Sequence, residues 1–294
     1  MILAGCSGMK TILVTGATSG IGLAAVRQIA AGGDRLVLVG RSRERLGAAA
    51  EQVRAAGAGA VDTLECDVAS PDSVRRLAAV VLESYERLDV LVNNAGGFFL
   101  TRRETPEGFE RTFATNHLGG FLLTELLLER LVRSAPARIV FTSSVMHYGA
   151  ALDLGDLGCR RGYTGVKSYG RSKLANVLYA RELSRRLAGT GVTANAFHPG
   201  AVATGIWDGV PWFVRPAVSV FKRVFLVPPE EGGRRLAYLV TDPDLVAVTG
   251  CYFQGDRVKV PSRVAADDAL GDRLSQVCAG LVGLAELVRP SGGR

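Results

Sequence analysis

The sequence predicts an α/β protein with one doubly wound parallel sheet of about seven strands and helices on both faces. Three observations predict this fold. Short apolar runs recur along the 294 residues, and longer segments with helical patterning separate them. A glycine-rich turn follows the first apolar run. No internal repeat and no linker rich in Pro, Gly and Ser divides the chain, so we expect a single domain over residues 11–290, preceded by a short extension at residues 1–10.

Seven apolar runs are the expected strands. The first, "TILVTG", is brief and rich in β-branched residues. In order, the runs cover residues 11–16, 35–41, 60–68, 88–96, 137–144, 192–200 and 250–255. Most of them are apolar without alternation, which indicates strands covered by helices on both faces.

Helices are expected between these strands. "GLAAVRQIAAGG" follows the first strand and "RERLGAAAEQVRAAG" follows the second. After the third strand, Ser70 can cap a helix that has Pro71 in its first turn. "TNHLGGFLLT" places Asn116 inside a mainly apolar helix, and "SYGRSKLANVLYA" has the pattern of an amphipathic helix. A further helix is expected to begin near Glu230.

Composition excludes several functions. The 35 Lys and Arg exceed the 28 Asp and Glu, giving a net charge of +7, but the basic residues are scattered without interleaved aromatic residues. We therefore expect no nucleic-acid partner. The five cysteines form no C-x-x-C pair, which is typical of reduced thiols in a cytoplasmic protein, and we expect no metal site. No apolar run reaches the roughly 18 residues of a membrane-spanning helix.

The first residues contain one ambiguous motif. "LAGC" at residues 3–6 resembles the tetrapeptide that precedes a lipid-modified cysteine. An export signal needs a basic start and an apolar region of roughly 7–15 residues, whereas two residues precede this motif. We interpret the match as accidental, and Met9 is an alternative start.

The turn after the first strand, "TGATSGIG", carries Gly16, Gly20 and Gly22. Glycines here permit positive φ and the close approach of a pyrophosphate, whose charge the N-terminus of the following helix favours. The spacing is G-x-x-x-G-x-G and not the commoner G-x-G-x-x-G. A plain tight turn would use the same residues, but the place after the first strand of a βαβ pattern favours a dinucleotide.

The second strand ends in "LVGRS". A site for NAD usually has an acidic residue at this strand end, whereas here Gly40 is followed by Arg41 and Ser42. An arginine can pair bidentately with a 2′-phosphate, so the sequence favours NADP(H) over NAD(H). The alternative is that Arg41 only begins the solvated face of the next helix.

Tyr169 and Lys173 lie one helical turn apart. An ammonium near a phenol, together with a bound cationic nicotinamide, lowers the phenol pKa from about 10 toward neutrality. Ser144 offers a hydroxyl donor at the end of the fifth strand. Taken singly, Tyr169 could be a core aromatic residue, Ser144 a helix cap and Asn116 a buried polar residue bonded to the backbone. Their joint occurrence in this order favours a proton-transfer site.

Together these features resemble the short-chain dehydrogenase/reductase family. T-G-x-x-x-G-x-G, N-N-A-G at residues 93–96, Asn116, Ser144, Y-x-x-x-K and "HPG" follow in the order typical of that family over nearly the whole chain. "EGFERTFATNHLGGFLLTELLLERL" and "SYGRSKLANVLYARELSRRL" are similar to its retinol-dehydrogenase-like branch. The resemblance implies a Rossmann-type fold.

The resemblance also implies a role for each matching residue. Tyr169 would be the general acid in carbonyl reduction, or the base in the reverse direction, and Lys173 would lower its pKa and hold the nicotinamide ribose. Ser144 would hydrogen-bond the substrate carbonyl oxygen, and Asn116 would support a water-linked proton relay. The implied cofactor residues are Gly16, Thr18, Ser19, Gly20, Ile21, Gly22, Arg41, Ser42, Asp67, Val68, Asn94, Ala95, Gly96, Tyr169, Lys173, Pro199, Gly200, Val202 and Thr204.

Residues 205–229 contain both tryptophans and three phenylalanines. In this family the substrate lid lies here, so we expect an apolar lid at about residues 203–229. A helix pair packed on the domain is an alternative, and contact with a membrane surface is another. The expected substrate residues are Met146, His147, Tyr148, Trp207, Trp212 and Phe213.

These features predict an NADP(H)-dependent oxidoreductase for a lipophilic ketone, aldehyde or alcohol. The alternatives are a non-redox enzyme, such as a cyclase, epimerase or dehydratase that keeps the nucleotide structurally, and a protein that senses the nucleotide. The high Ala, Arg and Gly content suggests a bacterial source and a step in secondary metabolism. The family often forms dimers or tetramers through the helices that contain Asn116 and Tyr169, and a monomer is equally compatible with this branch.

Overall fold

Strands of the protein form one sheet in the order β3-β2-β1-β4-β5-β6-β7-β8. The computed structural model describes residues 8–200 and 227–288. The strands are β1 (Thr11–Thr15), β2 (Arg35–Gly40), β3 (Ala60–Glu65), β4 (Val90–Asn93), β5 (Ala137–Thr142), β6 (Val192–His198), β7 (Tyr252–Gln254) and β8 (Arg257–Lys259). Strands from β3 to β7 pair in parallel, and β8 pairs antiparallel with β7. The predicted doubly wound sheet is confirmed.

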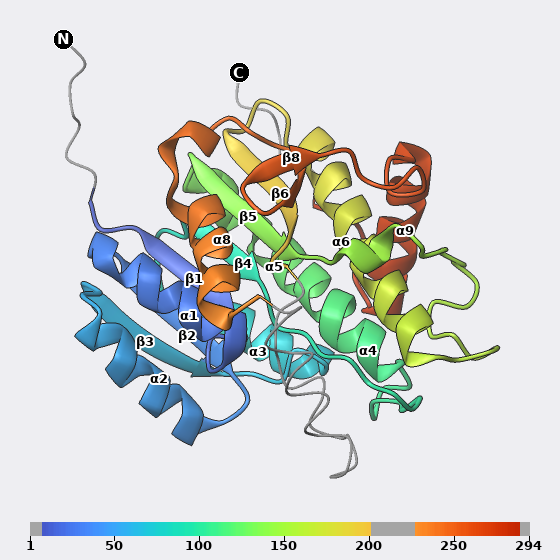
Figure 1. The fold of residues 1–294 in the computed structure, drawn as a ribbon, viewed down its shortest axis with the longest axis horizontal. Coiled ribbons are helices and arrows are strands. Elements are labelled where there is room, and N and C mark those ends of the chain that lie inside the picture. The colour runs from blue at the N-terminus through green and yellow to red at the C-terminus, as the bar shows by residue number, and fades with distance from the viewer. Residues whose placement is uncertain (1–7, 201–226, 289–294) are drawn as a thin grey trace.

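Helices cover both faces of this sheet and enclose two apolar cores (Figure 1). One face carries α1 (Gly20–Ile29), α2 (Arg43–Ala55) and α8 (Pro229–Thr241). The other carries α3 (Pro71–Ser84), α5 (Gly119–Arg133), α6 (Gly165–Arg186) and α9 (Asp268–Leu281). The short α4 (Arg111–Phe113) and a π-helical turn (Ala114–Leu118) lead directly into α5.

The position of β1 determines where a ligand can bind. β1 lies between β2 and β4, so the chain winds outward from β1 to β3 and then returns to β4 to wind in the opposite direction. The loops that leave β1 and β4 therefore diverge at the carboxyl ends of the strands. In open α/β sheets this divergence forms the ligand-binding crevice.

Two local features differ from the sequence predictions. β8 was not predicted, because its three residues at the edge of the sheet are all exposed and lack an apolar pattern. Its signal is the two-residue link Gly255–Asp256, in which Gly255 has a φ of +65°. Ser70 does occupy the N-cap position of α3, but its hydroxyl donates to Glu107 Oε1, 3.0 Å away, and does not cap the helix.

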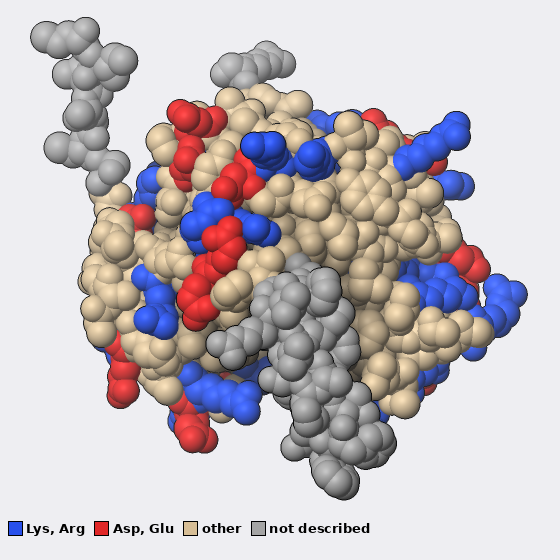
Figure 2. Space-filling view, in the orientation of Figure 1, with Lys and Arg blue, Asp and Glu red and all other residues tan. Residues whose placement is uncertain are grey.

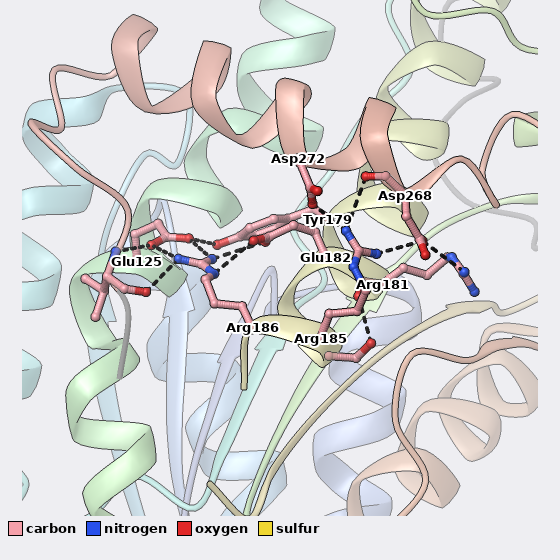
Figure 3. Close-up of polar contacts among 10 residues, drawn as sticks. Glu125, Tyr179, Arg181, Glu182, Arg185, Arg186, Asp268 and Asp272 are labelled. Atoms are coloured by element: carbon pink, nitrogen blue, oxygen red, sulfur yellow. Dashed lines mark hydrogen bonds and ion pairs between the residues drawn. The ribbon is translucent and has the colours of Figure 1, made fainter. Parts of the chain in front are cut away.

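A buried ion cluster joins α5, α6 and the segment after α9 (Figure 3). The Arg186 guanidinium binds the carboxylates of Glu125 and Glu182, and all three side chains are less than one-tenth exposed. The Tyr179 hydroxyl donates to Glu125, and Arg186 also donates to the carbonyl oxygen of Val288 at 2.8 Å. A buried arginine between two carboxylates is strongly held in place, because removing it would leave two buried charges without a partner.

More exposed ion pairs continue this contact toward α9. Arg181 and Arg185 of α6 both bind Asp268, at 3.1 and 2.7 Å, and Arg185 also binds Asp272. Figure 3 shows these side chains bridging the two helices. Individually such pairs contribute little, but here they continue a buried cluster.

Charges of both signs are interspersed on the face drawn in Figure 2. Within residues 8–200 and 227–288, no helix has both the length and the apolar content of a membrane span. The same residues contain no cluster of three potential metal ligands, and Cys66, Cys159, Cys251 and Cys278 are free thiols.

Candidate active site

The expected catalytic residues meet at the carboxyl ends of β4 and β5. Ser144 follows β5, Tyr169 and Lys173 lie on α6, and Asn116 lies in the π-helical turn before α5. Gly96, after β4, lies between two of them: a Cβ on Gly96 would be 3.1 Å from Asn116 Oδ1 and 3.4 Å from Lys173 Nζ. Lys173 Nζ is 5.4 Å from the centroid of the Tyr169 ring. Residues far apart in the sequence therefore surround one small volume.

Lys173 is buried and fixed by the backbone. Its Nζ donates to the carbonyl oxygen of Thr142 at 3.0 Å, and the residue is 3% exposed. Burial lowers the pKa of Lys173 to about 8, so the ammonium form still predominates at pH 7. The lysine thus presents one positive charge at a defined point, one helical turn beyond Tyr169.

Tyr169 and Ser144 are linked through their hydroxyls. Burial raises the pKa of Tyr169, and a side-chain hydrogen bond with Ser144 acts in the opposite direction. Burial is the larger effect, so the pKa of Tyr169 lies above its ordinary value in the protein without a ligand. A further positive charge next to the phenol acts in the opposite direction.

Ser144 also has a structural contact. It is 6% exposed, and its Oγ accepts a hydrogen bond from Met146 N at 3.2 Å, which caps the short turn Val145–His147. The cap and the contact with Tyr169 coexist, because a hydroxyl can accept one hydrogen bond while it donates another. The cap fixes where the hydroxyl lies.

Asn116 is held by the loop that follows β4. Its Nδ2 donates to Gly97 O at 2.9 Å and to Ser172 Oγ at 3.0 Å, and its Oδ1 accepts from Gly97 N at 2.7 Å. The π-helical turn presents the side chain in this direction, and such turns are frequent at functional sites. In this structure the Asn116 side chain fixes the loop at Gly97.

The glycine-rich turn has the geometry that a phosphate requires. Gly16 and Gly20 have φ values of +68° and +54°. A Cβ on Gly22 would lie 2.1 Å from Gly16 O, so the first turn of α1 packs directly on the loop. Ser19 is exposed and its side chain does not cap the helix, so the first N–H groups of α1 are not capped by it. These residues, with the partly exposed Thr18 between them, fit a dinucleotide phosphate.

Asn94 connects this turn to the rest of the site. Its Nδ2 donates to Thr15 O at 3.1 Å and to Gly16 O at 3.3 Å, and its Oδ1 accepts from Thr142 Oγ1. Ala95 packs on the same turn, because a Cβ on Gly16 would lie 2.9 Å from Ala95 Cα. Asn94 was expected beside the ribose, and its side chain is one of the groups that shape the glycine turn.

The expected adenosine-binding residues flank the crevice at β2 and β3. Arg41 is exposed directly after β2, and Ser42 caps α2 by accepting from Arg45 N at 3.3 Å. Asp67 is exposed after β3 and Val68 beside it is buried. Arg41 is therefore accessible to solvent at the carboxyl end of β2.

The expected substrate residues around Ser144 differ in exposure. Met146 is partly exposed and Tyr148 is 45% exposed, whereas His147 is fully buried. His147 Nδ1 is 2.7 Å from Ser144 O, and its Nε2 accepts from Ser262 N at 3.1 Å. His147 therefore anchors the turn, and the Tyr148 hydroxyl donates to the carbonyl oxygen of Val260 at 2.7 Å.

Phe98 is a neighbour of Tyr169 that sequence reasoning missed. The two ring centroids are 5.5 Å apart. Its only sequence signal is the aromatic pair that follows "NNAGG". After β6, Pro199 O accepts from Arg235 Nη1 at 2.9 Å and Gly200 has a φ of +104°. The lid at about 203–229 lies mostly outside the described residues, as do Val202, Thr204, Trp207, Trp212 and Phe213.

The chain is similar in sequence to proteins of one known family. The family described as short chain dehydrogenase matches residues 10–211. Retinol dehydrogenase 14 of Mus musculus is 40% identical over 288 residues, covering 94% of this chain and 86% of that protein. A putative daunorubicin C-13 ketoreductase of a Streptomyces strain is 39% identical, covering 93% of each.

Solved structures give the same result. An uncharacterised protein from Mycobacterium paratuberculosis has a TM-score of 0.77 and 31% identity, covering 96% of this chain and 95% of that one. A blue fluorescent protein from a metagenomic library, in complex with NADPH, has a TM-score of 0.65 and 28% identity, covering 83% of this chain and 95% of that one.

Proposed function

The chain belongs to the short-chain dehydrogenase/reductase family and is retinol-dehydrogenase-like, and we propose that it is an NADP(H)-dependent oxidoreductase for a lipophilic ketone or aldehyde, or the matching alcohol. One observation carries the proposal: Tyr169, Lys173 and Ser144 converge beside the glycine-rich turn. This convergence combines a proton donor, a cation and a hydroxyl next to a place for a dinucleotide.

In the proposed reduction, each side chain acts on the carbonyl oxygen or on Tyr169. The Ser144 hydroxyl donates to the oxygen as negative charge develops on it, and Tyr169 transfers its proton to the same oxygen. The Lys173 ammonium, held at Thr142 O, favours the phenolate that remains. When bound, the nicotinamide supplies the hydride and, once oxidised, the further positive charge.

Three observations support NADP(H) over NAD(H): the absence of a carboxylate at the end of β2, the exposed Arg41, and NADPH in the structure of a similar protein. β2 ends at Gly40 without a carboxylate, Arg41 is exposed beside it, and an arginine pairs well with a 2′-phosphate. The solved structure of a similar protein contains NADPH.

A lipophilic substrate is supported by Phe98 beside Tyr169 and by relatives named for retinol and for a daunorubicin ketone.

The first experiment measures oxidation of NADPH and NADH with a panel of lipophilic ketones and aldehydes, for wild type and Tyr169→Phe. We expect turnover with NADPH and a loss of at least about 100-fold in the variant, because it lacks the proton donor. Tight NADPH binding without oxidation of the nucleotide would favour the non-redox alternative. Better turnover of small polar carbonyls would contradict the lipophilic substrate.

A second variant tests the nucleotide preference. Arg41→Ala removes the proposed partner of the 2′-phosphate, so the KM for NADPH should rise about 10-fold to 100-fold while the KM for NADH stays unchanged. Arg45→Ala, on the exposed first turn of α2, is the matched control and should change neither value. A wild-type preference for NADH would refute the role of Arg41.

We also propose that the protein is a cytoplasmic bacterial enzyme and that it catalyses a step in secondary metabolism. The spacing of the cysteines, the Ala-, Arg- and Gly-rich composition and the Streptomyces relative support this setting.

A further inference from the structure

Asn176 is a buried residue next to the catalytic groups that the sequence analysis did not single out. It lies on α6 less than one helical turn after Lys173 and is 2% exposed. Its Nδ2 donates to Asn116 O and to Thr142 O, both at 3.0 Å. Thr142 O also accepts from Lys173 Nζ at 3.0 Å. One backbone carbonyl is therefore shared by the catalytic lysine and by this amide.

The contacts of Asn176 determine which way its amide faces. Backbone carbonyls only accept hydrogen bonds, so the NH₂ group must face Asn116 O and Thr142 O. Oδ1 then faces His117 Nδ1 at 2.9 Å, and His117 must carry its proton on Nδ1. Because His117 Nε2 is left without a proton, it accepts from the thiol of Cys278, 3.6 Å away on α9.

The protonation states agree with this direction of donation. Burial lowers the pKa of His117 to about 4, so its ring is neutral near pH 7. Burial raises the pKa of Cys278, so the sulfur keeps its proton. The hydrogen bonds therefore run in one direction, from Cys278 through His117 to Asn176 and on to the two carbonyls.

We propose that Asn176, oriented by His117, is a positioning residue that fixes Asn116 O and Thr142 O, and through Thr142 O the Lys173 ammonium. The proposal concerns the site of the proposed function and rests on it for its catalytic meaning. Asn176 keeps the carbonyl of Thr142 at the point where it accepts from Lys173 Nζ, and the carbonyl of Asn116 is held by the same amide. The side chain of Asn176 itself touches no reacting atom.

The first test is the tautomer of His117. The chain has three histidines, so ¹⁵N-histidine NMR resolves each ring, and His117→Phe assigns the signal. We expect a neutral ring protonated on Nδ1 in the wild type and a changed signal in Asn176→Leu. A ring protonated on Nε2 would overturn the proposal, because Asn176 Oδ1 would then have no donor.

The second test measures coupling between Asn176 and Lys173 through the Kd for NADPH, read by nucleotide fluorescence. In the wild-type background, Asn176→Leu should weaken NADPH binding about threefold to tenfold. In the Lys173→Met background, the same substitution should have no further effect on the Kd. Leu178→Ala, a buried control on the same helix, should act equally in both backgrounds. Equal effects of Asn176→Leu in both backgrounds would overturn the coupling.

The outcomes separate this proposal from the proposed function. An Nδ1 tautomer and coupled Kd values, with no nucleotide oxidation on any substrate, would retain the positioning role and reject the reductase. Substrate turnover together with an Nε2 tautomer would retain the reductase and reject the role of Asn176.

Discussion

Gly22 leaves no room for a side chain at the start of α1. A Cβ there would lie 2.1 Å from Gly16 O and 2.7 Å from Asn94 Nδ2, and neither group can move without shifting the turn that faces the crevice. Gly47 in α2 is a contrasting case, because a Cβ there would meet nothing within 4 Å. The two helical glycines differ only in what surrounds them.

We therefore expect opposite effects from two alanine substitutions. Gly22→Ala should lower the free energy of unfolding by about 1–3 kcal/mol and abolish NADPH binding, because it displaces Gly16 and Asn94. Gly47→Ala should raise the free energy of unfolding by about 0.5–1 kcal/mol and leave binding unchanged. Urea unfolding and fluorescence titration measure both, and full NADPH affinity in Gly22→Ala would contradict the packing described.

Residue types at strand ends could be predicted from the sequence, and their partners could not. The order of Ser144, Tyr169 and Lys173 along the chain, together with the family resemblance, predicts that they meet. His147, by contrast, bonds to Ser262, which is 115 positions away. No local pattern identifies such a partner, and the same is true of Asn176 and Asn116.

At the scale of elements, Glu182 of α6 lies among charged side chains from α5, α6 and α9. Burial, together with the nearby Glu125 and Asp272, raises the pKa of Glu182 from 4.5 to about 7, while Arg186 and Arg185 act in the opposite direction. Between these two pH values the folded protein holds a proton on Glu182 that the unfolded chain has released. The stability that this proton contributes is fully present below about pH 4.5 and is lost as the pH rises to about 7.

Glu182→Gln should remove this dependence. Relative to the variant, the wild type should lose about 1–3 kcal/mol of unfolding free energy between pH 5 and pH 8. Urea unfolding at several pH values measures the difference in unfolding free energy between the wild type and Glu182→Gln. Contributions from other titrating groups are common to both proteins and cancel in this difference. Arg133→Gln changes an exposed pair with Glu129 and should show no such slope. A constant difference between wild type and Glu182→Gln would contradict the raised pKa.

For whole elements, the pattern of apolar residues predicted the central strands of the sheet but not the edge strand β8. Strands β1, β2, β4, β5 and β6 are largely buried and mainly apolar because helices cover both faces. All three residues of β8 are exposed, so its sequence lacks an apolar pattern.

At the scale of the molecule, α9 covers part of the surface that the family resemblance assigns to a second copy. It packs along α6, and a Cβ on Gly271 of α9 would lie 3.4 Å from Leu178 O and 3.8 Å from Glu182 Cβ. Cys278 of α9 reaches His117 in the turn before α5. A partner docking on this face would have to displace α9 and its ion pairs.

We therefore expect a monomer in solution. Light scattering after size exclusion should give a mass near 31.1 kDa over a wide range of concentration. Substituting Asp268 and Asp272 by Asn weakens the outer contacts of α9 and should make its residues more open to hydrogen exchange without changing the mass. A stable dimer mass for the wild type would show that another face associates.

The docking of α9 also has a consequence for how the protein is made. α9 follows every strand of the sheet in the chain, yet it supplies Cys278, the first donor in the series of hydrogen bonds that ends at Thr142 O. During synthesis on the ribosome, the half of the sheet that carries the glycine-rich turn can assemble before α9 has emerged. A nascent or prematurely terminated chain would then have the glycine-rich turn but would lack the thiol that donates to His117.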